Sequence, residues 1–139
     1  MSHDLHHQFQ IQLKPSPDLW GGKLISTFHA AVTTPDATPT FLALITPPDN
    51  VCGRVEVVVL GVGAPPSVAV SCSFRKIITF KKVAGVVSLV GGVATVGVGQ
   101  ENAGTAVTFA INAGTISVNV TGIAATNINW VAEGQVFST

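Results

Sequence analysis

Residues 102–121 read NAGTAVTFAINAGTISVNVT, in which the motif Asn-Ala-Gly-Thr twice precedes a short run rich in Val, Ile and Thr. Asn and Gly tolerate positive φ, so each motif indicates a turn, and at 112–114 we expect the glycine to take the left-handed position. Between the turns the apolar residues recur at every second position, which is the period of a strand. The stretch therefore predicts a β-meander.

The period of two continues through the rest of the chain, where turns rich in Pro and Gly recur about every ten residues. That spacing is typical of a sandwich or jelly roll. We predict an all-β fold, a single jelly-roll-like β-sandwich domain at 23–139 preceded by an N-terminal arm at 1–22. The expected strands span 8–13, 23–32, 40–46, 54–62, 68–82, 83–90, 93–99, 106–111, 116–121 and 127–137.

The arm begins with a strand pattern that places Phe9, Ile11 and Leu13 on one face. Two prolines at 15 and 17 end this strand, and two glycines at 21 and 22 form a hinge before the domain. One interpretation is that the strand joins the edge of a neighbouring subunit, with its three apolar side chains as the contacts. The other is an ordinary first strand that folds back onto its own sheet.

Charge is scarce and unevenly distributed along the chain. The 139 residues carry 7 basic and 7 acidic side chains, so the formal net charge is zero and a basic nucleic-acid-binding surface is not expected. Beyond Lys82 the only charged side chains are Glu101 and Glu133. An exposed neutral surface rich in Val, Ala and Gly is unfavourable in water. We therefore expect the residues beyond Lys82 to lie at a subunit interface of a homotrimer.

The apolar stretches are too short and too interrupted for a membrane-spanning helix, and no membrane partner is expected. The first residues show no cationic segment followed by an apolar run, so we expect no signal peptide, and folding in a reducing cytoplasm. In that reducing compartment Cys52 and Cys72 are expected to be buried thiols rather than a disulfide.

Candidate catalytic and metal-binding residues are few. His3, His6 and His7 lie in the N-terminal tail with no Cys or paired carboxylate beside them, so no metal site and no cofactor is expected. His29 lies within a strand and is interpreted as structural. The acidic residues lie mostly in turns or tails and form no triad, so no enzymatic activity is expected, although a carboxylate pair for glycoside hydrolysis could assemble in three dimensions.

Two further groups of residues are candidate contacts. Arg75, Lys76, Lys81 and Lys82 form the basic cluster, which either binds an anionic partner or is a solvated strand face. Trp130 is either a core anchor or an exposed ring that stacks on a sugar. The core is favoured because the alternation puts this ring on the same face as other apolar residues.

Three segments in this order resemble a β-rich module of tailed-bacteriophage virion proteins. They are TPDATPT at 34–40, FKKVAGVVSLVG at 80–91 and VTGIAATNINW at 120–130, and the resemblance covers about residues 30–137. Such modules occur in tail-fibre proteins and in small proteins of the particle surface. The resemblance implies a non-catalytic, homo-oligomeric part, usually a trimer.

The sequence-based prediction is therefore a structural protein of the phage virion. Its first form is a trimeric capsid decoration (cement) protein, because the chain is small, neutral and large enough to fold alone, and its partners would be its own copies and capsid proteins. The alternative is a tail-fibre tip or receptor-binding module that recognises a host surface glycan.

Overall fold

The computed structural model describes residues 9–12, 24–63 and 70–139, and in these residues the structure consists of strands and their connections. The prediction of an all-β sandwich is confirmed. The strands are β1 (Phe9–Gln12), β2 (Leu24–Thr34), β3 (Thr40–Thr46), β4 (Val51–Gly63), β5 (Ser71–Val83), β6 (Val86–Leu89), β7 (Ala94–Gln100), β8 (Ala106–Asn112), β9 (Thr115–Thr121) and β10 (Ile128–Ser138).

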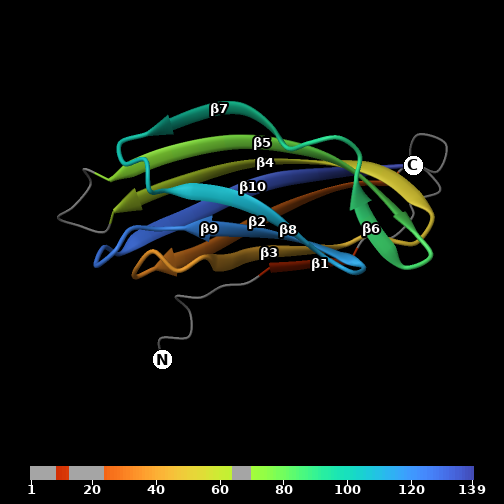
Figure 1. Cartoon of the computed structure of the whole chain (residues 1–139), viewed down its shortest axis with the longest axis horizontal. Helices are drawn as coiled ribbons and strands as arrows, with labels where there is room; N and C mark the ends of the chain where they lie inside the picture. Colours follow the sequence, from red (N-terminus) through yellow and green to blue (C-terminus); the bar gives the residue numbers. More distant parts are fainter. Residues whose placement is uncertain (1–8, 13–23, 64–69) are drawn as a thin grey trace.

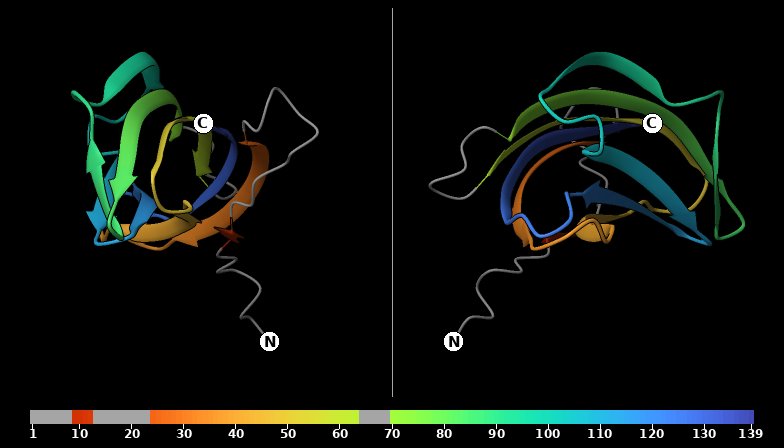
Figure 2. Two further views of the ribbon diagram at one scale, coloured as in Figure 1. Left: turned by 90° about the vertical axis from the view of Figure 1, so that its right-hand side faces the viewer. Right: turned by 60° about the vertical axis from the view of Figure 1, so that its left-hand side comes forward.

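The strands form two sheets that face each other (Figure 1). The small sheet has the order β1-β3-β9-β8, and the large sheet has the order β2-β10-β4-β5-β6, with β7 also paired with β5. Figure 2 shows the large sheet arching over the small one. Consecutive strands change sheets repeatedly along the chain, which is a feature shared with jelly rolls.

Strand β1 pairs in parallel with β3 of its own chain, with Phe9 opposite Ala43 and Ile11 opposite Ile45. Within one chain the strand thus lies at the edge of the small sheet. Leu13, the three N-terminal histidines and the rest of the predicted arm lie outside the described residues. Exchange of this strand between subunits stays a prediction.

The β8–β9 hairpin corrects the expected turn geometry. The residue with positive φ is Ala113, at 50°, and not Gly114. Gly114 is instead a point of close approach, because a Cβ there would lie 3.1 Å from the carbonyl oxygen of Gly85 and 3.2 Å from Nζ of Lys82. Glycine at this position therefore leaves room for the neighbouring β5–β6 turn.

Alternating residues of both sheets form the core. Val55, Val57 and Val59 of β4 are buried, and Val118 and Val120 of β9 are buried opposite them on the small sheet. Fully burying a side chain of this size stabilises a fold by about 1.5–3 kcal/mol. The spacing of two thus produces one continuous apolar layer between the sheets.

Three aromatic rings on the inner face of the large sheet lie across glycines of the neighbouring strand. A Cβ on Gly61 would lie 2.8 Å from the ring of Trp130, and one on Gly53 would lie 2.6 Å from the ring of Phe80. In each case the ring and the glycine are directly opposite in the strand register, so the ring fills the place of the missing side chain. The three pairs are Phe28–Gly134, Phe80–Gly53 and Trp130–Gly61.

Trp130 lies in the core with 1% of its surface exposed. Its indole Nε1–H donates a hydrogen bond to Oγ1 of buried Thr34 at 2.9 Å. The apolar part of the ring is thus packed, and its one polar group has a partner inside the protein.

Gly134→Ala is expected to destabilise the fold by about 1–3 kcal/mol, because the added Cβ would overlap the ring of Phe28. Urea unfolding followed by circular dichroism measures the change. Gln135→Ala, at the next and exposed position of β10, is the matched control and is expected to stay within about 0.5 kcal/mol of the wild type. Equal stability of the two variants would contradict the packing described.

Trp130→Ala is expected to lower the free energy of unfolding by about 3–5 kcal/mol, the usual cost of removing a large buried aromatic side chain. Trp130→Phe keeps a ring over Gly61 but leaves Thr34 without the indole donor, and a smaller loss of about 1–3 kcal/mol is expected. The same unfolding experiment measures both. A Trp130→Ala variant as stable as the wild type would overturn the assignment of this ring to the core.

Candidate functional site: a furrow on the outer face of the large sheet

The outer face of the large sheet carries three adjoining hollows, of about 620, 350 and 450 Å³. The first and second share Leu60 and Val131, and the second and third share His29, Val58 and Glu133. Together they form one depression, which we call the furrow. It follows β10 and β4 and includes residues of β2, β5 and β7, those of β7 being Gly99 and Gln100.

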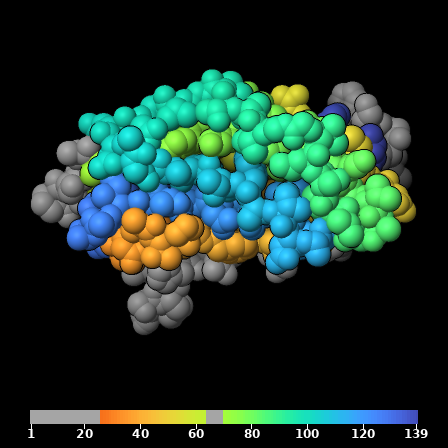
Figure 3. All heavy atoms as spheres, viewed as in Figure 1, coloured from red at the N-terminus to blue at the C-terminus, as the bar shows by residue number. Residues whose placement is uncertain are grey.

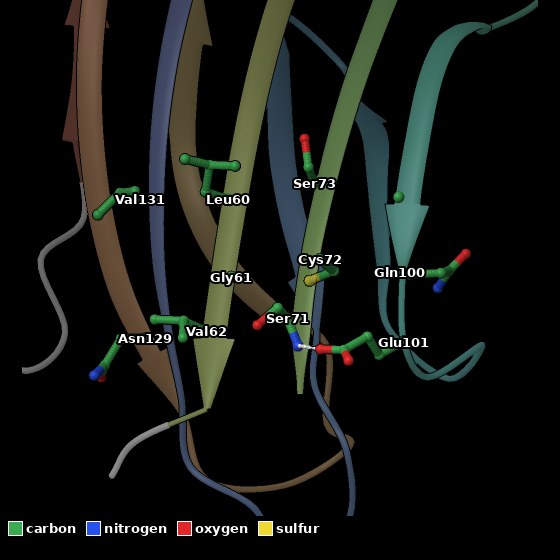
Figure 4. Close-up of a pocket in the computed structure, with 11 residues that line it drawn as sticks. Leu60, Gly61, Val62, Ser71, Cys72, Ser73, Gln100, Glu101, Asn129 and Val131 are labelled. Atoms are coloured by element: carbon green, nitrogen blue, oxygen red, sulfur yellow. Dashed lines mark hydrogen bonds between the residues drawn. The ribbon is translucent and has the colours of Figure 1, made fainter. Parts of the chain in front are cut away.

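One end of the furrow has an apolar floor (Figure 4). Leu60 and Val62 of β4 and Val131 of β10 line the hollow there, and each has 41–52% of its surface exposed. At its rim Oε1 of Glu101 accepts a hydrogen bond of 3.0 Å from the backbone N–H of Ser71. This contact holds the chain after β7 against the start of β5.

Asn129 lies at the same end of the furrow. Its side-chain oxygen accepts a hydrogen bond of 2.9 Å from the hydroxyl of Thr33 on β2. The amide nitrogen of Asn129 is thereby oriented by a fixed neighbour. The apolar floor thus has a polar group at its end.

The other end of the furrow is charged. Nδ1 of His29 lies 3.6 Å from Oε2 of Glu133, across the β2–β10 pair. Glu56 is held between two guanidinium groups, at 3.1 Å from Nη2 of Arg54 and 3.5 Å from Nη2 of Arg75. Both carboxylates line the same hollow, so this end presents donors and acceptors of both charges side by side.

The length of the furrow follows from strand geometry. It extends along β10 from Asn129 to Gln135, which is about 20 Å at the usual rise of 3.4 Å per residue. A depression of this length, apolar at one end and charged at the other, suits an extended chain rather than a compact ligand.

The structure does not gather the predicted basic cluster into one surface. Arg75 faces the furrow, and Lys81 is exposed on the same side of β5. Lys82 is buried, and its ammonium donates a hydrogen bond of 2.7 Å to the carbonyl of Pro47. Lys76 lies opposite the buried Val57 and is partly exposed. Strand alternation separates the four side chains.

Other predicted residues come together only in the folded chain. His29, interpreted from the sequence as structural, has a side chain that is 75% exposed and paired with Glu133. Glu56 and Glu133 are two of the seven acidic residues of the chain, and they line the same hollow. The outward alternation of β2 and β10 could be seen in the sequence, but the fact that β10 lies between β2 and β4 could not.

The expectation of two buried thiols is wrong for one of them. Cys72 is buried, but Cys52 is exposed. Burial raises the pKa of the Cys72 thiol, an effect that hydrogen bonds to Thr105 and to the backbone of Gly61 partly offset. Cys52 lies at the start of β4, where its position in the alternation turns it to the outer face.

Within residues 24–63 and 70–139, no group of three or more His, Cys, Asp or Glu side chains is placed to hold a metal ion. The described part of the chain also has no helix long and apolar enough to cross a membrane.

Comparison with known proteins gives matches at the level of structure. No protein-family model matches the sequence, and no curated protein matches it. The crystal structure of the tailspike protein gp49 from Acinetobacter baumannii bacteriophage Fri1, a capsular polysaccharide depolymerase, matches 91% of this chain with a TM-score of 0.52 and 12% identity. The chain shares its fold with part of the Fri1 tailspike. It spans 19% of the Fri1 tailspike.

Two further tailspikes are similar at lower scores. The tailspike protein of Acinetobacter baumannii phage AM24 matches 82% of this chain with a TM-score of 0.48 and 6% identity, and this chain covers 26% of it. The tailspike protein of Acinetobacter phage vB_ApiP_P1 matches 83% with a TM-score of 0.37 and 16% identity, and this chain covers 21% of it.

These matches change two of the sequence-based predictions. The resemblance to a β-rich module of tailed-phage virion proteins is confirmed at the level of the fold. The expectation of no enzymatic activity is overturned, because the same fold is part of a protein described as a capsular polysaccharide depolymerase. The capsid decoration role is not confirmed.

The two cysteines are expected to react very differently with a thiol reagent such as 5,5′-dithiobis(2-nitrobenzoate). At pH 7 one thiol of the folded protein, that of exposed Cys52, should react rapidly and displace one equivalent of nitrothiobenzoate from the reagent. The second thiol should react only after the protein is unfolded in urea. The raised pKa of Cys72 leaves less thiolate at neutral pH, and burial blocks access to it. Cys52→Ser should abolish the rapid phase. Rapid reaction of two thiols in the folded wild type would contradict the placement of Cys72.

Proposed function

We propose that this chain is a domain of a phage tail protein that recognises bacterial capsular polysaccharide through the furrow. The fold similarity to the Fri1 tailspike, which extends over 91% of the chain, carries the proposal. The name of that protein supplies the ligand class, a polymer of the bacterial surface.

The furrow has the chemistry that a polysaccharide requires. Sugar rings have apolar C–H faces, and the exposed side chains of Leu60 and Val131 offer a complementary floor. Sugar hydroxyls both donate and accept, and hydrogen bonds to ionised side chains are stronger than those between neutral groups. Glu56 is held in place by Arg54 and Arg75 before any ligand arrives, which lowers the entropy cost of binding.

The chain is further proposed to act in the virion as a homotrimer. A rotational assembly places several furrows on one particle, and several weak contacts on one polymer then combine into strong attachment. The predicted arm at 1–22 is kept as a proposed contact with neighbouring subunits, with Phe9, Ile11 and Leu13 as its apolar side chains.

Binding of purified capsular polysaccharides, including those of Acinetobacter baumannii strains, tests the proposal by isothermal titration calorimetry. The wild type is expected to bind at least one member of the panel. Val131→Lys places a long charged side chain on the apolar floor and should weaken the affinity per subunit by about tenfold or more, which corresponds to about 1.4 kcal/mol.

Thr108→Lys is the matched control, because Thr108 is exposed on β8 of the opposite sheet and does not line the furrow. It should bind as the wild type does. A wild type that binds no capsular polysaccharide of the panel would refute the function. Unchanged affinity in Val131→Lys would move the site away from the furrow.

A further inference from the structure

We infer that residues 83–100 are the surface on which other copies of this chain pack. We call this segment, which includes β6 and β7, the neutral patch. The inference rests on the proposed self-association and is independent of polysaccharide binding. In Figure 3 the segment extends from the right-hand end of the molecule along its upper border.

The neutral patch is exposed and apolar, and it carries no charge. All residues from 83 to 100 are exposed except Val87 and Leu89, and none of the 83–100 segment is Asp, Glu, Lys or Arg. Six of its valines have 44–56% of their surface exposed: Val83, Val86, Val90, Val93, Val96 and Val98. About a quarter of the residues in an ordinary soluble domain are charged, so this composition is that of a covered surface.

Strand β7 is an edge strand whose side chains do not protect it against pairing. Among the described strands it pairs only with β5. It contains no Lys and no Pro, the residues that normally guard an exposed edge. The register with β5 shifts at Val96, between the pairs Arg75–Gly97 and Lys76–Thr95. A bulge of this kind disfavours a regular added strand, so contact through the valine side chains is favoured.

The glycines of β7 give an independent indication of a partner. Glycine weakens the interior of a strand and usually marks a place where another group comes close. Gly53, Gly61 and Gly134 have such a group within this chain, but a Cβ on Gly97 or Gly99 would meet no atom within 4 Å. Neither Gly97 nor Gly99 has a positive φ that would require glycine. Gly99 also lines the first hollow of the furrow, whereas Gly97 does not, so a close approach by a second molecule at the neutral patch explains Gly97.

A second copy of the chain is the occupant that the charge pattern favours. Residues that lie close to a rotation axis meet the same residues of the other copies, so a charged side chain there would face like charges. The neutral patch avoids this repulsion entirely, whereas the furrow carries charged groups of both signs. A standard interface uses about 20–30 residues a side, and the exposed part of 83–100 supplies most of that number.

Light scattering after size exclusion tests the inference on the full chain at micromolar concentration. The wild type is expected at about three times the 14.3 kDa of one chain. The double variant Val96→Lys with Val98→Lys should be a monomer, because each copy would bring two positive charges into the contact. Circular dichroism shows whether it remains folded. A second pair, Val83→Lys with Val86→Lys, should have the same effect at the other end of the patch.

Gly97→Ala sharpens the test, since its Cβ would meet no atom of its own chain within 4 Å and Gly97 does not line the furrow. The fold should be unaffected, while association should weaken by about tenfold or more if a partner approaches there. Val131→Lys, a valine of the furrow with the same 52% exposure as Val96, should stay oligomeric.

The outcomes separate the two proposals. Monomeric wild type, or lysine variants that remain oligomeric, would overturn the inference about the neutral patch. Loss of the oligomer in Val131→Lys alone would place the interface at the furrow and overturn it as well. An oligomeric wild type that binds no polysaccharide would leave the inference intact and refute only the proposed function.

Discussion

The packing of aromatic rings against strand glycines is the constraint on which the rest of the structure depends. Phe28, Phe80 and Trp130 are the largest fully buried side chains, and each lies directly across a glycine of the next strand. A side chain at any of these glycines would leave no room for the ring between the sheets. The pairs therefore set both the thickness of the core and the strands that are neighbours.

The same pairs determine the outer face. Side chains alternate along a strand, so a slip of one residue would carry every inner group to the outside. The register that places Trp130 opposite Gly61 also places Val131 opposite Leu60 and Glu133 opposite Val58. The furrow is thus a consequence of the core packing, because its floor and its charged end are the positions between the buried ones.

The glycines of the large sheet divide into two groups with different surroundings. Aromatic rings of the same chain lie over Gly53 and Gly61 of β4 and over Gly134 of β10, whereas Gly97 and Gly99 of β7 face open space. The division matches that of charge, since the furrow contains His29, Glu133 and the Glu56 cluster, whereas β7 and β6 are neutral. The furrow is thus suited to bind a polar ligand, and the neutral patch is suited to contact a second copy of the chain.

The sequence by itself determined the fold class and most of the strands. The period of two at 106–111 and 116–121, with Asn-Ala-Gly between them, corresponds to the observed β8–β9 hairpin, because strand period and turn residues are local properties of the chain. Even there the residue with positive φ is Ala113. Gly114 is instead required by tertiary packing, because Gly85 and Lys82 lie where its side chain would be.

Only the tertiary structure decided which strands are neighbours, and with that the candidate site. His29 and Glu133 lie far apart in the sequence, as do Glu56 and Arg75, and no local pattern shows that they share a hollow. The basic residues 75, 76, 81 and 82 are close in sequence, yet alternation and the burial of Lys82 separate them. Strand pairing depends on long-range packing in the core, and it determines which surface residues become neighbours.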